Sequence, residues 1–257
     1  MINIVKIGGN VVDDPAALSS FLDDFARLKG DKILVHGGGK EASRLSRAMG
    51  MTPQMIDGRR VTDAATLDVV TMVYAGLINK RIVAGLQARG CNAIGLTGAD
   101  GNAVPAVRRS PEPVDYGFVG DINPGDINSS LILRLFDSGM SPVFCAICHD
   151  SRGSLLNCNA DSVAAALARG LSIYEEVRLT YCFERPGVML DINDESSVIP
   201  LVTAESFARL REEGVVAEGM IPKLQNALQS ASAGVDEVRI CAASALLGDG
   251  GTIIRRQ

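Results

Sequence analysis

Short runs of apolar, largely β-branched residues alternate along this chain with longer segments in which apolar residues recur at helical spacing. The first run, Ile2–Ile7, ends at two glycines, and the second, Lys32–His36, ends at three. Apolar runs bounded by glycine predict buried strands, and helical segments between successive strands predict crossover connections. The chain is therefore predicted to fold as an α/β protein with a mainly parallel sheet.

The remaining elements follow from the same periodicities and from capping signals. Asp14-Pro15 is typical of a helix start, with the aspartate as N-cap and the proline in the first turn. A lobe boundary is predicted near Gly170, which divides the chain into residues 1–169 and 170–257. Further strands are predicted at Asn92–Leu96, Pro142–Cys148, Ser154–Leu156, Glu176–Cys182 and Glu237–Cys241, further helices at Lys40–Met49, Thr62–Arg89, Asp126–Ser138, Thr203–Glu213 and Gly219–Ala233, an alanine-rich helix up to Arg169, and a hairpin outside the sheet within Ala103–Asp121.

Composition and charge limit the class of protein. Of the 257 residues, 47% are hydrophobic and 21% are charged, and the formal net charge is −5. Because no stretch is strongly basic, the chain lacks the cationic surface that binds nucleic acid, and no such partner is expected. No apolar run is expected to reach the ~20 residues of a membrane helix, and the N-terminus lacks a signal-peptide pattern. A cytoplasmic protein without membrane association is predicted.

Six cysteines occur, and Cys145 and Cys148 have the spacing of a zinc-binding pair. No second such pair follows and the sequence has only two histidines, so a zinc site is not expected. Both cysteines lie in an apolar, strand-like run. They are predicted to be small buried hydrophobic residues in a reducing compartment.

Lys6 interrupts the first apolar run directly before Gly8-Gly9. A lysine is almost never fully buried without a partner, and ligands of open α/β sheets bind beyond the carboxyl ends of the strands. Lys6 is therefore a candidate ligand-binding cation. A lysine on an edge strand with its ammonium group in water would explain the same pattern.

Gly37-Gly38-Gly39 is a candidate anion-binding loop. Glycines let the backbone approach a ligand without steric interference from Cβ, and the N-terminus of the following helix presents free N–H groups with partial positive charge. One glycine usually suffices for a tight turn, so three favour an anion site. Gly8-Gly9 offers a second, weaker loop of this kind, and His36 at the strand end is interpreted as structural.

Three further segments carry polar groups that a fold alone would not require. The segment Asn157-Cys158-Asn159-Ala160-Asp161 has three cap-forming residues where one helix needs one, so some are free for a ligand. Arg60, which follows Arg59, is suited to bidentate binding of a carboxylate, although a solvated loop arginine is the alternative. Lys223 lies one turn into a predicted helix, where the dipole disfavours a cation. The motifs GxxxxGK[ST], GxGxxG, GxSxG and HExxH are absent from the sequence.

Together these segments resemble the amino-acid kinase family, and within it the members that phosphorylate an N-acylated glutamate. The matching motifs occur in the family's order from residue 2 to about residue 223: Val5-Lys6-Ile7-Gly8-Gly9, Val35–Gly39, Gly58–Thr62, Gly95–Gly101, Asn157–Asp161 and Gly219–Lys223. Each motif alone is weak, but the set is specific. The resemblance implies an open three-layer αβα sandwich in which residues 1–169 bind the N-acylglutamate and residues 170–257 bind ATP.

The resemblance also implies a reaction. The γ-phosphoryl group of MgATP would be transferred to the side-chain carboxylate of N-acetyl-L-glutamate in arginine biosynthesis, with Mg²⁺ held through the ATP phosphates and not by a protein metal site. Lys6 and Lys223 would stabilise the charge of the moving group, and Asp161 would orient both lysines. Arg60 would bind the α-carboxylate of the substrate, and Asn157 the rest of its amino-acid backbone. The glycines expected to offer backbone N–H groups to phosphoryl oxygens and the reacting carboxylate are Gly8, Gly9, Gly38 and Gly39.

One segment departs from the family pattern. Relatives usually carry Thr/Ser-Asp-x-x-Gly-Val/Ile after the first strand of the ATP lobe, whereas Thr180–Val188 of this chain is longer and lacks that aspartate. The nucleotide loop is therefore expected to differ, with Tyr181 or Phe183 either flanking the adenine or belonging to the core. The residues predicted to contact ATP are Thr180, Tyr181, Phe183, Gly187 and Val216.

Several alternatives remain open. The acyl group could be N-succinyl, in which case Arg108 or Arg109 would bind its second carboxylate. Another enzyme of the same fold, such as a carbamate, uridylate or glutamate 5-kinase, is disfavoured by Arg60 and the segment 157–161. A catalytically silent regulatory homologue is disfavoured because both lysines and the aspartate are present. Arginine-inhibited hexameric relatives carry an additional N-terminal helix before the first strand, so a homodimer without arginine feedback is expected.

Overall fold

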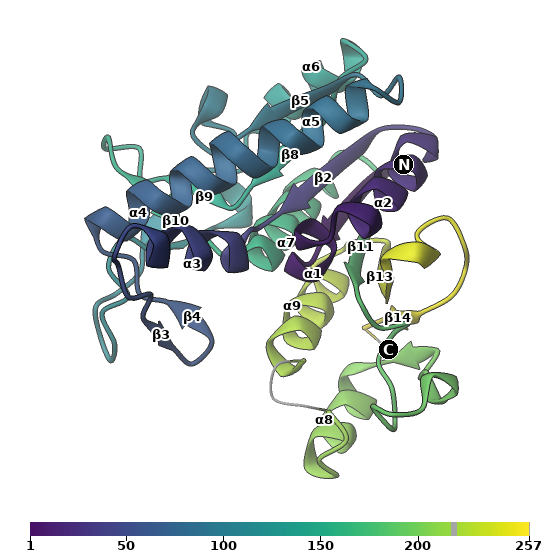
Figure 1. The fold of residues 1–257 in the computed structure, drawn as a ribbon. Coiled ribbons are helices and arrows are strands. Elements are labelled where there is room, and N and C mark those ends of the chain that lie inside the picture. Colours follow the sequence, from purple (N-terminus) through teal and green to yellow (C-terminus); the bar gives the residue numbers. More distant parts are fainter. Residues whose placement is uncertain (217–219, 257) are drawn as a thin grey trace.

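The computed structural model describes residues 1–216 and 220–256, which form a large sheet with helices on both faces (Figure 1). The strands of this sheet are β1 (Ile2–Ile7), β2 (Lys32–His36), β5 (Ala93–Leu96), β8 (Ser141–Cys145), β11 (Val177–Phe183), β12 (Leu201–Val202), β13 (Glu237–Ala242) and β14 (Thr252–Ile254). They lie in the order β12-β14-β13-β11-β1-β2-β8-β5, and every neighbouring pair is parallel except β13–β14. The predicted α/β class with a mainly parallel sheet is confirmed.

Ten helical segments longer than one turn cover this sheet within the described residues. They are α1 (Gly9–Asp13), α2 (Pro15–Arg27), α3 (Gly39–Ala48), α4 (Ala64–Thr71), the π-helical η1 (Met72–Ile78), α5 (Asn79–Gln87), α6 (Ser129–Asp137), α7 (Ala160–Leu171), α8 (Ala204–Glu212) and α9 (Ile221–Ser232). Contacts place α6, α7 and α9 against one face, over β8, β1, β11 and β13, and α5 with α2 against the other, over β5 and β8. The sheet thus forms the middle layer of three (Figure 1).

Small elements complete the fold. Three antiparallel two-stranded ribbons are formed by β3 (Met55–Ile56) with β4 (Arg59–Arg60), β6 (Val107–Arg108) with β7 (Gly120–Asp121), and β9 (Ile147–His149) with β10 (Leu155–Asn157). Single 3-10 turns are η2 (Asp100–Asn102), η3 (Pro124–Asp126), η4 (Glu195–Ser197) and η5 (Ala243–Ala245). The ribbon of β6 and β7 lies where a hairpin outside the main sheet is predicted.

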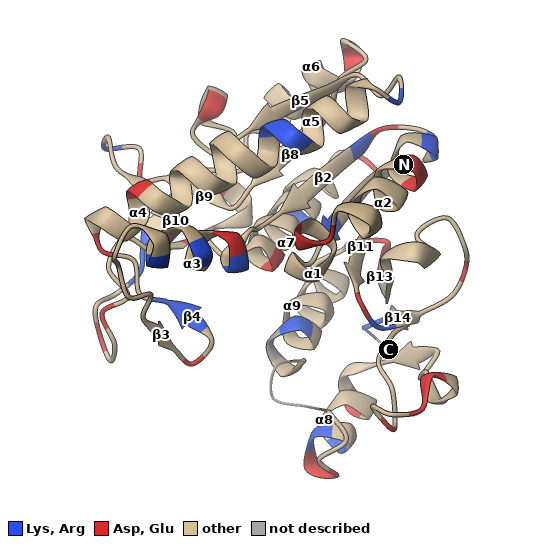
Figure 2. Ribbon diagram, in the orientation of Figure 1, with Lys and Arg blue, Asp and Glu red and all other residues tan. Residues whose placement is uncertain are grey.

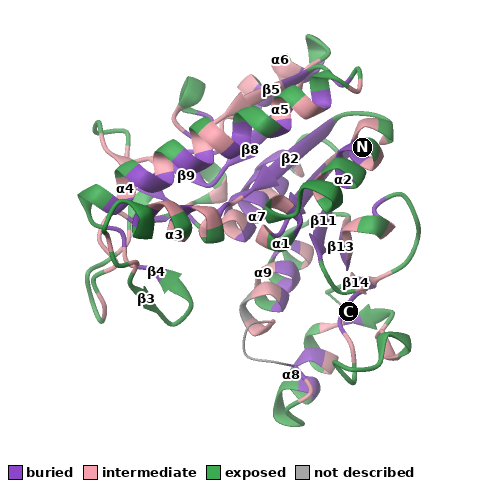
Figure 3. Cartoon of the chain, in the orientation of Figure 1, coloured by how far each residue is buried: buried purple, intermediate pink, exposed green. Residues whose placement is uncertain are grey.

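The alternation of side chains along β1 decides where Lys6 points. Ile2 and Ile4 belong to the core cluster beneath α7, whereas Val5 and Ile7 belong to the cluster on the opposite face, with α2 and α5. Successive side chains of a strand point to opposite faces, so Lys6 shares the face of Ile2 and Ile4. Figure 3 shows the buried central strands between exposed outer helix surfaces. Lys6 is therefore directed at α7, near the edge where the strands end.

Three sequence predictions about elements are wrong in detail. The predicted strand Pro142–Cys148 ends at Cys145, and after Ala146 the chain leaves the main sheet to form β9 with β10. The predicted glycine loop after β1 continues directly into α1, and a final strand, β14, follows where none was predicted. An apolar run predicts burial, but the strand with which it pairs depends on distant segments, so these boundaries are not encoded locally.

One long helix meets the criteria of length and composition for a membrane span. Ala64–Gln87, which combines α4, η1 and α5, has 24 residues and a mean hydropathy of 1.3 over its most apolar window. The segment is not one uninterrupted apolar run, because Asp68, Lys80 and Arg81 lie within it, and the criteria rest on length and composition alone. Of that window, 44% is buried inside the protein, where α5 packs against β5 and β8. The packing of its buried side against the core accounts for part of its apolar character.

The cysteines match their prediction. All six are free thiols and all six are buried. Cys145 lies at the end of β8 and Cys148 in β9, each with no exposed surface. Burial raises the pKa of Cys145 to about 12, so this thiol stays protonated and behaves as an apolar group. The role of small buried hydrophobic residues is confirmed.

Candidate functional site

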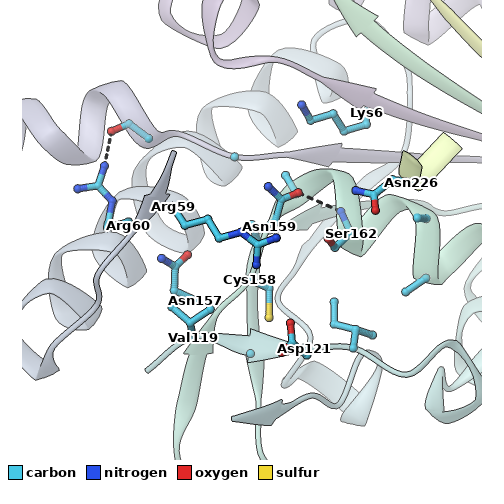
Figure 4. Close-up of a pocket in the computed structure, with 18 of the residues that line it drawn as sticks. Lys6, Arg59, Arg60, Val119, Asp121, Asn157, Cys158, Asn159, Ser162 and Asn226 are labelled. Carbon is cyan, nitrogen blue, oxygen red and sulfur yellow. Dashed lines mark hydrogen bonds between the residues drawn. The ribbon is translucent and has the colours of Figure 1, made fainter. Parts of the chain in front are cut away.

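A cavity of about 420 Å³ opens beyond the carboxyl ends of β1 and β2. Its lining comes from β1, the glycine loop before α3, β4, the junction of β10 and α7, and α9. Figure 4 shows Lys6 on one side of this cavity and Arg59, Asn157 and Asp121 on the other. Figure 2 shows basic segments on β4 and on α9, two of the elements that line it. The cavity thus lies where an open parallel sheet is expected to bind a ligand.

A buried ion pair stands at the wall of the cavity. The Nζ of Lys6 lies 2.7 Å from Oδ1 of Asp161, and only 9% and 11% of the two side chains are exposed. Asp161 lies in the first turn of α7, whose N-cap is Asn159. The Oδ1 of Asn159 accepts hydrogen bonds from the N–H groups of Asp161 (2.8 Å) and Ser162 (3.1 Å). Because Asn159 alone supplies the cap, the carboxylate of Asp161 is free to hold Lys6.

Lys223 comes to the same place from α9. Its Nζ lies 3.9 Å from the ring centroid of Phe183, and the Nζ of Lys6 lies 4.9 Å from the same centroid. Burial lowers the pKa of Lys223, and Lys6 adds to this effect, whereas Asp161 opposes it. The expected ion pair of Asp161 is present with Lys6, while Lys223 contacts the aromatic ring instead. The structure therefore gathers all three predicted catalytic residues, and their roles stay predictions.

Gly38 is required by a close approach of two elements. It is the N-cap of α3, and a Cβ atom on it would lie 2.3 Å from Cδ1 of Ile78 and 3.0 Å from Cδ1 of Tyr74. The loop therefore packs directly against η1, and the N-terminus of α3 is directed at the cavity. Gly39, which begins α3, also lines the cavity. Free N–H groups at such a terminus favour an anion.

Gly8 and Gly9 continue β1 beside this loop. A Cβ atom on Gly8 would lie 3.4 Å from the ring of Phe183, and one on Gly9 would lie 3.6 Å from the carboxylate of Asp13. Neither glycine is therefore required by packing within the protein. Gly9 lines the cavity. The predicted role of both glycines in phosphate binding is untested, and the N–H group of Gly8 already donates to the carbonyl oxygen of Cys182 (3.1 Å).

His36 is fully buried and is hydrogen-bonded to the glycine loop. Its Nδ1 lies 2.8 Å from the carbonyl oxygen of Gly37, and its Nε2 lies 3.1 Å from Nδ2 of Asn79. Burial lowers the pKa of His36 to about 4, so the ring is neutral at pH 7. The amide of Asn79 donates to Nε2, which leaves the proton on Nδ1 to be donated to Gly37. The structural role predicted for His36 fits this arrangement.

Only part of the guanidinium group of Arg60 is hydrogen-bonded within the described residues. Its Nη2 donates to the carbonyl oxygen of Gly39 (2.9 Å) and to Oγ of Ser43 (2.7 Å). Its Nη1 is buried and has no hydrogen-bond partner among the described residues. Burial raises the pKa of the neighbouring Tyr74, whose hydroxyl therefore stays protonated and able to donate. A guanidinium group with unused N–H donors beside a cavity fits a carboxylate ligand.

Asn157 and Arg109 border the opposite side of the cavity. Nδ2 of Asn157 donates to Oγ1 of Thr62 (3.0 Å), and its side chain lines the cavity. Arg109 also lines the cavity and is ion-paired with Asp121. Arg108 instead packs over the ring of Phe118, 4.9 Å from its centroid. Of the two arginines considered for a second carboxylate, only Arg109 is placed at the cavity, and its charge is already paired.

The residues predicted to contact ATP lie mostly inside the protein. Thr180 and Tyr181 are buried in β11, with 4% and 1% exposed, and Val216 is buried after α8. A Cβ atom on Gly187 would lie 2.7 Å from Oγ1 of Thr252 in β14. The predicted contacts of these residues with ATP are untested, and Phe183 is the one whose ring lies beside both lysines. The predicted division into lobes at residue 169 is untested too.

The sequence pattern did not identify several residues that line the cavity. Tyr74 comes from η1, whose π-helical turn has no signal in the apolar periodicity. Asn226 and Ser230 come from α9, and Arg169 from the end of α7. Asn226 follows Lys223 by three residues and so shares its helix face, a spacing that could have revealed it.

The comparisons with known proteins agree with this geometry. The sequence model of the amino acid kinase family matches residues 1–242, and the chain belongs to this family. It is 49% identical over 255 residues to a Bacteroides fragilis protein named acetylglutamate kinase, an alignment covering 99% of this chain and 97% of the relative. It is 50% identical over 245 residues to the acetylglutamate kinase of Cytophaga hutchinsonii, covering 95% and 92%. Among solved structures, smu.665 from Streptococcus mutans superposes with a TM-score of 0.84 at 26% identity, covering 100% of this chain and 99% of that one.

Proposed function

We propose that this protein is an acetylglutamate kinase. It transfers the γ-phosphoryl group of MgATP to the side-chain carboxylate of N-acetyl-L-glutamate, the acyl-phosphate-forming reaction of arginine biosynthesis. The observation that carries the proposal is the convergence of Lys6, Asp161 and Lys223 at a cavity with a glycine-rich helix N-terminus. The name shared by the curated relatives, at about half identity over nearly the whole chain, supports the same reaction.

The reaction needs positioning and charge neutralisation more than covalent catalysis. A carboxylate oxygen of the substrate attacks the γ-phosphorus, and the bond to the β–γ bridging oxygen breaks, which gives the acyl phosphate and ADP. Lys6 and Lys223 neutralise charge on the transferred group, and Asp161 holds Lys6 in place. Backbone N–H groups of the two glycine loops donate to phosphoryl and carboxylate oxygens. Gly9, Gly38 and Gly39 are assigned this role, whereas the N–H group of Gly8 already donates to the carbonyl oxygen of Cys182 (3.1 Å).

Mg²⁺ enters with the nucleotide in this proposal. The carboxylate of Asp161 is already paired with Lys6, and that of Asp121 in the cavity lining is paired with Arg109, so neither is free to hold a cation. Within the described residues, no group of three or more acidic, histidine or cysteine side chains gathers around a point. This donor set fits a metal that is held by the ATP phosphates, where it neutralises their charge.

Substrate recognition is assigned to the part of the site built by residues 1–169. The unused Nη1 of Arg60 binds the α-carboxylate, and the side chain of Asn157 binds the amide region. ATP is assigned to residues 170–257, including Thr180, Tyr181, Phe183, Gly187 and Val216. Arg60 and Asn157 come from the ribbon strands β4 and β10, whereas Thr180, Tyr181 and Phe183 come from β11 of the main sheet.

A hydroxylamine trap tests the proposal. Purified protein and MgATP are offered N-acetylglutamate, N-succinylglutamate and free glutamate in parallel, and the acyl phosphate is captured as hydroxamate. Product from N-acetylglutamate, and little from the other two, is expected. Product mainly from N-succinylglutamate would transfer the proposal to that acyl group, and product from free glutamate alone would move the protein to a sister activity. ATP binding without any product would favour a regulatory protein.

The cellular setting is proposed on other observations. Six free, buried cysteines fit a reducing compartment, and a cytoplasmic location follows.

The apolar helix Ala64–Gln87 is less than half buried over its most apolar window, and Met72 on it is 49% exposed. A second copy of the chain covering this helix would make a homodimer. Light scattering on the eluting protein should give twice the 27.1 kDa of one chain, and a monomeric mass would refute the dimer.

A further inference from the structure

We propose that Phe183 is a positioning residue for both lysines: the face of its ring holds the ammonium groups of Lys6 and Lys223 at the site of phosphoryl transfer before ATP arrives. This inference rests on the proposed kinase function and deepens it. It gives Phe183 a role different from that of an adenine contact.

The geometry places both cations over the ring of Phe183. Phe183 is the last residue of β11, the neighbour of β1, and 4% of its surface is exposed. Its centroid lies 3.9 Å from the Nζ of Lys223 and 4.9 Å from the Nζ of Lys6, both within the ~6 Å range of cation–π attraction. Tyr181 lies parallel to the ring, with centroids 6.3 Å apart and an interplanar angle of 3°. The strand and this stacking fix the orientation of the ring.

The charges around the ring explain why an uncharged group is needed to bind the second ammonium group. Asp161 forms its ion pair with Lys6 and also attracts Lys223, the exposed Glu184 adds a smaller attraction to Lys223, and the two lysines repel each other. Burial further disfavours the charge on Lys223. The negative face of an aromatic ring attracts a cation without carrying a net charge. Phe183 therefore offsets part of the cost of placing a second ammonium group here.

An uncharged partner for Lys223 also favours the binding of the ATP phosphates. A second carboxylate would bind Lys223 tightly and would repel the incoming ATP, whereas a cation–π contact is weak enough to be exchanged for a phosphoryl oxygen. The ring consequently keeps the lysines in position without competing with the nucleotide. The expected cost of weakening this contact is a slower transfer step, because misplaced cations stabilise the transferred group less.

A fluorination series at position 183 tests the role. Phe183 is replaced by 4-fluoro-, 3,5-difluoro- and 3,4,5-trifluorophenylalanine, which withdraw electron density from the ring face and change its shape little. We expect kcat to fall in step with the weakening of cation–π attraction, to about tenfold in total, with a small change in the KM for ATP. The same series at Phe144, buried in β8 within the core, should leave kcat unchanged. Phe183→Leu should lose activity and Phe183→Tyr should recover most of it.

Two kinetic results would overturn the inference. A flat kcat across the series would mean that the ring acts through its shape alone. A rise in the KM for ATP with constant kcat would mean that the ring stacks on the adenine. Both outcomes leave the kinase activity itself intact, so they separate this inference from the proposed function.

A spectroscopic measurement checks the contact without using activity. With ¹³C-labelled lysine, the ε-methylene resonances of Lys223 are identified by their loss in Lys223→Arg. A ring 3.9 Å from Nζ should shift them upfield relative to those of the exposed Lys29, and the shift should vanish in Phe183→Leu. Resonances of Lys223 at the position of Lys29 would refute the contact. An upfield shift in a protein that forms no acyl phosphate would keep the contact and refute the kinase.

Discussion

The Nζ of Lys6 in β1 and Oδ1 of Asp161 in α7 lie 2.7 Å apart in a part of the protein from which water is nearly excluded. The pair joins the central strand of the sheet to the helix that covers it, at the edge where the glycine loops lie. Breaking a buried ion pair by removing one partner leaves an uncompensated charge, which costs about 3–5 kcal/mol. This pair therefore links the stability of the fold to the chemistry of the site.

Asp161→Asn should lower both stability and turnover. Neutralising the carboxylate strands the ammonium group of Lys6, so the free energy of unfolding in urea should fall by about 3 kcal/mol. The misplaced lysine should reduce kcat by about 100-fold. Asp23→Asn, which breaks the exposed pair with Arg89, is the control and should cost less than about 1 kcal/mol with kcat unchanged. Equal unfolding curves for the Asp161 variant and the parent would contradict the coupling.

Lys223→Ala should abolish most turnover and keep the fold. Lys223 is partly exposed, and its ammonium group neutralises negative charge on the transferred phosphoryl group. We therefore expect kcat to fall by about 10³-fold. The thermal midpoint should stay near that of the parent, because its buried neighbour Phe183 keeps its own packing in β11. Lys29→Ala, on the surface after α2, serves as the control. Turnover close to that of the parent would remove Lys223 from the mechanism.

Arg60→Lys should affect substrate binding more than catalysis. Lysine keeps the charge but cannot form the paired hydrogen bonds of a guanidinium group, so the KM for N-acetylglutamate should rise about 10- to 100-fold, with a smaller change in kcat. Arg47→Lys, on the exposed side of α3, should change neither value. If the KM for ATP rises instead, Arg60 belongs to the nucleotide side of the cavity.

Much of this site could be predicted from local sequence, and the reasons are physical. The strand period of two and the glycines after β1 place Lys6 at the carboxyl end of a buried strand. The excess of cap-forming residues before α7 frees Asp161, because one cap uses only Asn159. Both arguments depend on residues within a few positions of one another. The family resemblance then brings Lys223 to the same site, which local pattern alone would leave as a surface lysine.

The remaining features depend on segments that are distant in sequence. The contact of Lys223 with Phe183 requires β11 to lie beside β1 and α9 to pack over β13, and no periodicity encodes that order. The break after Cys145 depends on the pairing of β9 with β10. The π-helical turn that brings Tyr74 to the cavity follows the same apolar spacing as the α-helix around it. Such choices are made by tertiary packing.

Gly38→Ala should destabilise the loop before α3 by overpacking. The added methyl group would lie 2.3 Å from Cδ1 of Ile78 and 3.0 Å from Cδ1 of Tyr74, so these side chains or the loop must move, at a cost of about 1–3 kcal/mol. The double variant Gly38→Ala/Ile78→Ala should lose less stability than the sum of the two single variants, because the shortened side chain removes the clash. Gly76→Ala, where a Cβ atom meets nothing within 4 Å, is the control and should be neutral or slightly stabilising. A Gly38 variant as stable as the parent would show that the loop accommodates a side chain.

The buried His36 should make stability fall below neutral pH. Its pKa is about 4 in the folded protein, against 6.5 for an ordinary histidine, so the unfolded chain binds the proton more tightly. Stability from this group is therefore complete above pH 6.5 and is lost as the pH falls from 6.5 to 4, by roughly 3 kcal/mol in total. The free energy of unfolding in urea is measured at closely spaced pH values for the parent and for His36→Gln. Plotted against pH, the two curves should differ in slope within this window and run parallel above it. Parallel curves for the His36 variant and the parent throughout would mean that folding does not lower the pKa of His36, and a protonated Nε2 would then have to donate to the amide oxygen of Asn79.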